Sequence, residues 1–273
     1  MYLIEKNNVM KLAEELAKNY DLYGPVIDKE TKQVFFNKVE SASQISLTAE
    51  IPAVPPKTVV FPQIERITKY KYDKVGRKAE ISMTYDDRSK AIFGIRPCDL
   101  TGIVVLDRFF LGQEFVDDVY KEHRKRMFIV SNTCVVPFKQ CFCVCTDSGP
   151  AADEGYDLNL TEIGDMYLVE AGSEKGKAFA EKMGLKAAGD EYIALKKKAV
   201  DKSISLFEEL ATDNKAWISR VMNRVTTGFI KDDVWKHIGN QCFECGACSF
   251  VCPTCSCFNI EDANLASGET NRL

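Results

Sequence analysis

The C-terminal part of the chain contains the stretch Cys242-Phe-Glu-Cys245-Gly-Ala-Cys248-Ser-Phe-Val-Cys252-Pro253. Its spacing, C-x2-C-x2-C-x3-C-P, is the run that holds a [4Fe-4S] cluster in bacterial ferredoxins. Gaps of two residues curl the backbone so that successive thiolates converge, and backbone amides then point toward the cluster sulfurs. We therefore expect a ferredoxin-like segment here, with Cys242, Cys245, Cys248 and Cys252 as metal ligands.

Three residues inside this run are expected to lie against the cluster. Gly246 can adopt the left-handed backbone conformation and so bring the main chain close to it. Pro253 supplies a rigid turn that leads the chain away. Phe243 would shield the cluster from water, which lowers its reduction potential.

The fourth ligand of the run is open at this point. In two-cluster ferredoxins the cysteine before proline binds the other cluster, and this chain contains no second run of that kind. Cys252 therefore either completes its own cluster or awaits a neighbour, and Cys255 and Cys257 are alternative ligands or ordinary thiols. Paired C-x2-C units also bind zinc, but zinc ribbons usually separate their pairs by a longer insert.

Composition narrows the class of protein. The chain has 273 residues, a formal net charge of -4 and eleven cysteines. We expect no nucleic-acid partner, because no basic field is present. We also expect a cytoplasmic protein without a membrane span, because the sequence contains neither a secretory leader nor an apolar run of about 20 residues. In a reducing compartment, so many cysteines indicate metal or redox work rather than disulfides.

Upstream of residue 185, strands alternate with helices. The apolar run 91–95 predicts a strand that leads into a helix capped by Asp99, and 127–130 predicts a further strand. This alternation is typical of an α/β or α+β body. We therefore divide the chain into a body (1–185) with an expected cluster site, a helical connector (186–239) and a cluster-binding segment (240–273).

A second group of cysteines lies in the body. Cys98 and Cys134 each follow a predicted strand, and the ends of two parallel strands meet at one edge of a sheet. Cys141, Cys143 and Cys145 would share one face if their segment were extended. A second cluster and buried or redox-sensing thiols both remain open from these residues alone.

Several motifs together resemble one family: the 4Fe-4S dicluster family that contains the β subunit of sulfhydrogenase-type NiFe hydrogenases and an iron–sulfur subunit of anaerobic sulfite reductase. They are Phe61-Pro-Gln-Ile-Glu65, Gly94-Ile-Arg-Pro-Cys-Asp-Leu100, Cys141-Phe-Cys143 followed by Gly149-Pro150, and Cys242 to Phe258. Two departures stand out. Cys145 occupies a position where a serine or similar residue is expected, and family chains continue to a second ferredoxin run whereas this one ends at Leu273.

The resemblance implies an electron-transfer subunit with two [4Fe-4S] clusters and no catalytic residues of its own. It implies Cys98, Cys134, Cys141 and Cys143 as ligands of the cluster in the body. Family members relay electrons between a flavoprotein subunit, which handles NAD(P)H with FAD or FMN, and a catalytic or further iron–sulfur subunit. The complex would be a hydrogenase, a sulfite reductase or a heterodisulfide-reductase-linked enzyme.

Two other functions stay open from the sequence. One is a flavin-dependent reductase subunit that binds its own FAD or FMN. The other is a zinc-stabilised interaction module. Neither histidine stands out as a functional group, since His123 lies among charges on a predicted surface helix.

Overall fold

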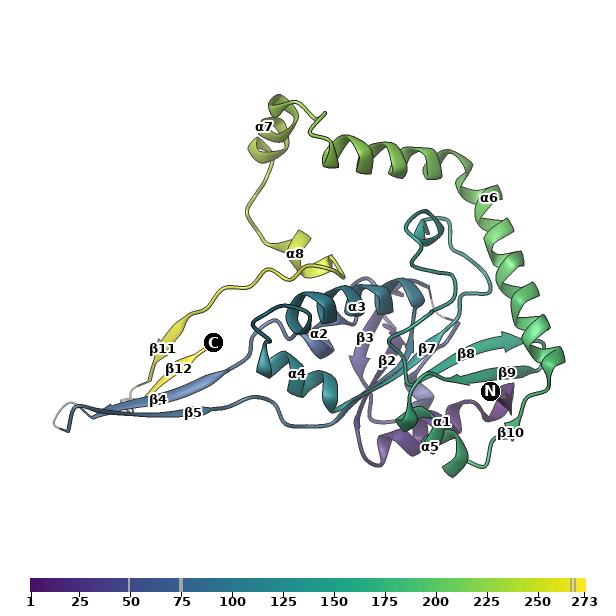
Figure 1. The fold of residues 1–273 in the computed structure, drawn as a ribbon, viewed down its shortest axis with the longest axis horizontal. Coiled ribbons are helices and arrows are strands. Elements are labelled where there is room, and N and C mark those ends of the chain that lie inside the picture. The colour runs from purple at the N-terminus through teal and green to yellow at the C-terminus, as the bar shows by residue number, and fades with distance from the viewer. Residues whose placement is uncertain (49, 74–75, 266, 268) are drawn as a thin grey trace.

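We describe the chain from a computed structural model (Figure 1). It describes residues 1–48, 50–73, 76–265, 267 and 269–273, and within one long helix it leaves out the side chains of 208–219. The helices are α1 (Met10–Ala17), α2 (Lys57–Val60), α3 (Pro97–Leu111), α4 (Asp118–Lys125), α5 (Glu174–Lys182), α6 (Asp190–Thr226), α7 (Asp232–Asn240) and α8 (Ala247–Val251). The strands are β1 (Tyr2–Glu5), β2 (Asp21–Ile27), β3 (Val34–Lys38), β4 (Thr68–Asp73), β5 (Lys78–Met83), β6 (Lys90–Ile95), β7 (Met127–Asn132), β8 (Leu158–Ile163), β9 (Met166–Ala171), β10 (Lys186–Ala187), β11 (Asp262–Asn264) and β12 (Glu269–Arg272).

A mixed sheet forms the centre of the body. Among the described residues it has eight strands in the order β10-β1-β9-β8-β7-β6-β2-β3. The pairs β2/β6, β6/β7 and β7/β8 are parallel, whereas the outer pairs are antiparallel. The predicted α/β or α+β class is therefore confirmed.

The central strands are buried on both faces, which explains why they read as continuous apolar runs. In β6, Ala91 and Phe93 belong to the core on one face, and Ile92 and Ile95 belong to the core on the other. Residues of α1 and α5 pack into the first core, and residues of α2, α3 and α4 pack into the second. The helices therefore lie on both faces of the sheet, and α3 follows directly on β6 (Figure 1).

Helix α3 begins one residue earlier than its predicted cap. Arg96 is the N-cap residue, Pro97 occupies the first turn, and Asp99 lies inside that turn. Proline is favoured there because its missing N–H is one of the donors that a helix start leaves unpaired. The prediction that Asp99 caps the helix is therefore wrong, although its carboxylate still lies near the positive end of the helix dipole.

The last residues of the chain return to the body. In the described part of the chain, β11 and β12 form a four-stranded antiparallel sheet with β4 and β5, in the order β11-β12-β4-β5. Figure 1 shows α6 running away from the body, while α7 and α8 lead back toward α3. Residues 262–272 are thus joined by backbone hydrogen bonds to a ribbon formed by residues 68–83. The proposed domain boundaries stay a prediction.

Candidate iron–sulfur sites

Four cysteines of the body line one cavity. Cys98, Cys134, Cys141 and Cys143 surround about 330 Å³ of empty space. The first two follow the neighbouring parallel strands β6 and β7, so the two strand ends meet as expected. The remaining walls are formed by Ile51, Arg96, Pro97, Phe138, Gly149, Pro150 and Phe207.

The loop that carries the other two cysteines is folded rather than extended. Cys143 to Cys145 form a 3-10 helical turn, so these thiols do not alternate along a strand. The prediction of three thiols on one face is therefore wrong, and Cys145 does not line the cavity. Gly149 lies against the site, because a Cβ atom there would be 3.0 Å from the sulfur of Cys143.

Burial controls the charge state of these thiols. It raises the pKa of Cys98 and Cys134, and it raises the pKa of Cys143 to about 12, with neighbouring thiols adding to each effect. A buried thiolate is costly without a positive partner, because it has lost its hydration. Without such a partner the cavity favours neutral thiols.

One cation already contacts this group. Nη1 of Arg96 lies 3.3 Å from Sγ of Cys134, and its guanidinium lies 5.4 Å from the ring centroid of Phe138. Its charge opposes the effect of burial on the pKa of Cys134. Arg96 is therefore placed to donate to a sulfur and to stabilise negative charge at the site.

Left-handed residues shape the C-terminal run. Gly246 has φ +72°, which confirms its expected conformation, and Glu244 has φ 54°. These reversals bend the chain between Cys242 and α8, and the backbone N–H of Glu244 donates to Sγ of Cys242 at 3.4 Å. A conformation of this kind aims backbone amides at sulfur, as the spacing of the run predicts.

The sulfurs of this run differ in exposure. Cys242, Cys245, Cys248 and Cys257 are exposed, while Cys252 and Cys255 are half-buried. The backbone and side chain of Cys257 hydrogen-bond Cys255 and lower its pKa, whereas the same contact raises the pKa of Cys257. Cys255 and Cys257 therefore lie side by side. The side chain of Phe243 is 95% exposed, and its shielding role stays a prediction.

The C-terminal run is anchored to the body at two points. A Cβ atom on Gly102 of α3 would lie 2.8 Å from Cβ of Pro253, so the helix and the run are in close contact. Nζ of Lys57 donates to the backbone oxygens of Ser249 at 2.6 Å and Cys255 at 3.3 Å. Both anchors lie beside cysteines of the run.

Comparison with known proteins agrees with the cysteine pattern. Residues 241–273 match the family model of the 4Fe-4S dicluster domain. The β subunit of sulfhydrogenase 2 from Pyrococcus furiosus is 30% identical over 254 residues, which cover 92% of this chain and 71% of that relative. The chain belongs to the sulfhydrogenase β-subunit family. No solved structure matches it.

The donor atoms of this β-subunit homologue fit iron–sulfur clusters. In the described chain the ionisable side chains on the cavity are the four cysteines and Arg96. Cysteine thiolates are the usual ligands of [4Fe-4S] clusters. Within the described residues, no three His, Cys, Asp or Glu side chains form a group suited to one metal ion. Over the same residues, no helix has the length and apolar character of a membrane span.

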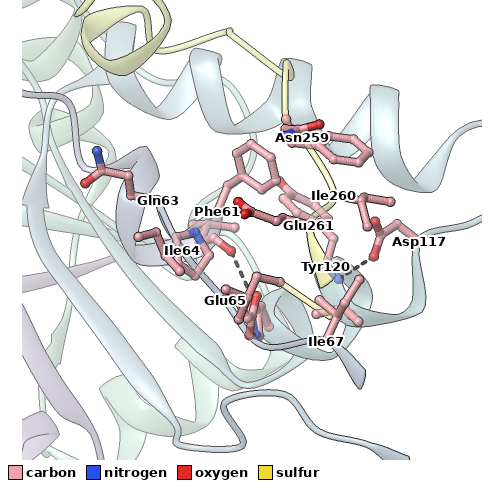
Figure 2. Close-up of a pocket in the computed structure, with 16 residues that line it drawn as sticks. Phe61, Gln63, Ile64, Glu65, Ile67, Asp117, Tyr120, Asn259, Ile260 and Glu261 are labelled. Atoms are coloured by element: carbon pink, nitrogen blue, oxygen red, sulfur yellow. Dashed lines mark hydrogen bonds and ion pairs between the residues drawn. The ribbon is translucent and has the colours of Figure 1, made fainter. Parts of the chain in front are cut away.

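A separate pocket shows what another family motif does. Phe61, Gln63, Ile64 and Glu65 line about 1010 Å³ of empty space between α4 and the residues that follow the cysteine run (Figure 2). Aromatic side chains dominate one wall, since Phe258 packs edge-on against Phe61 with ring centroids 6.3 Å apart. The motif of residues 61–65 in this β-subunit homologue therefore lines a pocket that contains none of its cysteines.

His123 lies at the edge of this pocket and is buried, contrary to its expected place on a charged surface. Its Nδ1 lies 3.0 Å from the backbone oxygen of Val60, and its Nε2 lies 2.9 Å from Oε1 of Glu65. Burial by itself lowers the pKa of His123, but Glu65 and the Val60 carbonyl outweigh it and raise the pKa above the usual value. Sequence periodicity missed this because it treats α4 without the segment that covers it.

Sequence reasoning also missed two cations. Arg96 lies inside the motif Gly94 to Leu100, so its position next to Cys98 was an available signal. Lys57 follows two prolines and lies nearly 200 residues from the carbonyls that it binds. No local pattern indicated that contact.

Proposed function

We propose that the chain is a non-catalytic electron-transfer subunit with two [4Fe-4S] clusters. Cys98, Cys134, Cys141 and Cys143 would hold one cluster. The run from Cys242 would hold the other, with Cys252 or Cys255 as its fourth ligand. Each bound cluster would supply one-electron chemistry, without a bond made or broken in a substrate.

The observation that carries this proposal is the path of α3. The helix starts beside the first group of cysteines and contacts the second run four residues later, at Gly102. Four residues of α-helix span about 6 Å along the axis. One short, rigid element therefore connects the two groups, as a relay within one chain requires.

The residues around the first group have supporting roles. Burial keeps water from the four sulfurs, and Arg96 stabilises negative charge there, which favours a reduced state. Gly149 leaves room beside Cys143 that a larger residue would fill. These are positioning roles, and no described residue is assigned to substrate chemistry.

The partners follow from the relative. Its name describes a β subunit of a sulfhydrogenase, so we infer that this chain also works inside a hetero-oligomeric oxidoreductase. Electrons would pass between a flavoprotein subunit, which handles NAD(P)H with FAD or FMN, and a catalytic or further iron–sulfur subunit. The terminal donor or acceptor would be set by that subunit.

Anaerobic purification with iron and sulfide counts and EPR of the reduced chain tests the proposal. We expect Cys98→Ser and Cys245→Ser each to abolish a different cluster signal, because each removes a ligand of one group. Cys145→Ser should retain both signals, because its thiol does not line the cavity. A Cys98→Ser chain with every signal intact would refute the site in the body.

Two other outcomes would redirect the assignment. Zinc without acid-labile sulfide would indicate an interaction module instead. A bound yellow cofactor in the purified chain would indicate a reductase that carries its own flavin.

A further inference from the structure

Lys57 is a buried cation beneath the C-terminal cysteine run. It lies at the start of α2, after Pro56, and only 4% of the residue is exposed. Lysine is rarely buried so completely unless its charge is paired, because removing an ammonium from water is costly. The position of Lys57 therefore calls for a compensating negative group.

No protein carboxylate within the described ranges of the chain forms an ion pair with Lys57. Its ammonium instead donates to two backbone oxygens, at 2.6 Å to Ser249 and at 3.3 Å to Cys255. Carbonyl oxygens satisfy the hydrogen-bonding capacity of an ammonium but carry no net charge to balance it. The positive charge is left for another partner.

The two carbonyls lie on either side of the expected cluster. Ser249 directly follows Cys248 in α8, and Cys255 is itself a candidate fourth ligand. Lys57 therefore joins the helix that carries the third cysteine of the run to the loop that carries the last ones. Its ammonium lies on the inner side of the run, away from solvent.

A cluster bound by four thiolates is a net anion, and reduction adds one electron without a proton or a bond change. A charge near it acts strongly when both are shielded from water, because the effective dielectric constant is low. Net charge around a cluster is one of the factors that set its reduction potential. A buried ammonium should therefore stabilise the reduced form.

We propose that Lys57 is a positioning residue that holds the C-terminal run against the body and raises the reduction potential of the cluster in that run. The inference rests on the proposed function, since it requires a cluster bound by this run. It assigns the neutralising role to a residue outside the ferredoxin-like segment. The body would thus tune a cluster that it does not bind.

The test is an EPR-monitored titration of the full chain with dithionite, comparing Lys57→Gln, Lys57→Arg and Lys57→Met. Lys57→Gln keeps a hydrogen-bond donor without charge, Lys57→Arg keeps the charge, and Lys57→Met keeps neither. Lys236→Met is the matched control, because Lys236 is an exposed lysine on α7, just before the run. The signal to follow is the one that Cys245→Ser removes.

We expect Lys57→Gln to lower the midpoint potential of that signal, while Lys57→Arg and Lys236→Met stay close to the wild type. Lys57→Met should bind less iron at the C-terminal run and keep the Cys98-dependent signal. If Lys57→Gln also loses the C-terminal cluster, retention by Lys57→Arg supports the role of the charge, and equal loss in both overturns it.

Two results separate failure of this inference from failure of the proposed function. A wild-type chain without any Cys245-dependent signal overturns both. A full C-terminal cluster with an unchanged potential in Lys57→Gln overturns the role of Lys57 and leaves the proposed function standing.

Discussion

His123 and Glu65 join two segments that are distant in sequence. The imidazole is buried between α4 and residues 60–65, with an ion-pair distance of 2.9 Å to Glu65. Because the folded state raises the pKa of His123, protonation stabilises the fold. This contribution is complete below the unfolded pKa of about 6.5 and is lost as pH rises through the higher folded value.

We therefore expect the melting temperature of the wild type to fall as pH rises from about 6 to about 8, the range in which histidine titrates. Glu65→Gln removes the carboxylate that raises the pKa, so its melting temperature should depend less on pH. Glu114→Gln makes the same charge change at an exposed site and should keep the wild-type slope. Equal slopes in Glu65→Gln and the wild type would contradict the ion pair.

At the scale of elements, α3 links both groups of cysteines. Its first turn carries Cys98, and Gly102 lies one turn further on, against Pro253. A side chain at Gly102 would meet Cβ of Pro253 at 2.8 Å and its backbone oxygen at 3.0 Å. A proline ring and a backbone oxygen cannot move aside like the end of a flexible side chain, so the run itself would have to shift.

Gly102→Val should accordingly displace the C-terminal run and reduce its cluster content, while the Cys98-dependent signal persists. Overpacking of this kind costs on the order of 1–3 kcal/mol. The control is Gly239→Val in α7, where nothing lies within 4 Å of an added Cβ. Iron counts and EPR of both variants provide the measurement, and an unaltered C-terminal signal in Gly102→Val would contradict the contact.

At the scale of the whole molecule, the chain leaves the body through α6 and returns through its C-terminal hairpin (Figure 1). Residues 231–241 are exposed, and so are 220–229, whereas β12 pairs with β4 inside the second sheet. The link is therefore accessible while both of its ends are held. Local stability should follow the same division, since exposed helices without packing contacts open most easily.

Limited trypsin digestion should cut first near Arg220, Arg224 or Lys231, because these basic residues lie in the exposed link. The two fragments should still elute together in size-exclusion chromatography, because β12 and Lys57 hold the C-terminal part to the body. Mass spectrometry identifies the cut. Separate elution of the nicked fragments without denaturant would show that these contacts are too weak.

The sequence by itself determined the class of the fold, the ligand chemistry and the family. Continuous apolar runs such as 91–95 indicated buried central strands, and the spacing from Cys242 indicated a cluster run with Gly246 in a left-handed conformation. These features are local, because periodicity and spacing reflect the backbone of one segment. They extended to Cys98 and Cys134 only because parallel strand ends meet at one edge.

Only the tertiary structure decided which cysteines of the body share a cavity and which cations lie beside each group. A helical turn after Cys143 separates Cys145 from the cavity, and Lys57 reaches carbonyls nearly 200 residues away. Whether a lysine is solvated or buried under a distant loop depends on contacts that no local pattern records. The physical reason is that burial and charge pairing are properties of the folded surroundings, not of the neighbouring residues in the chain.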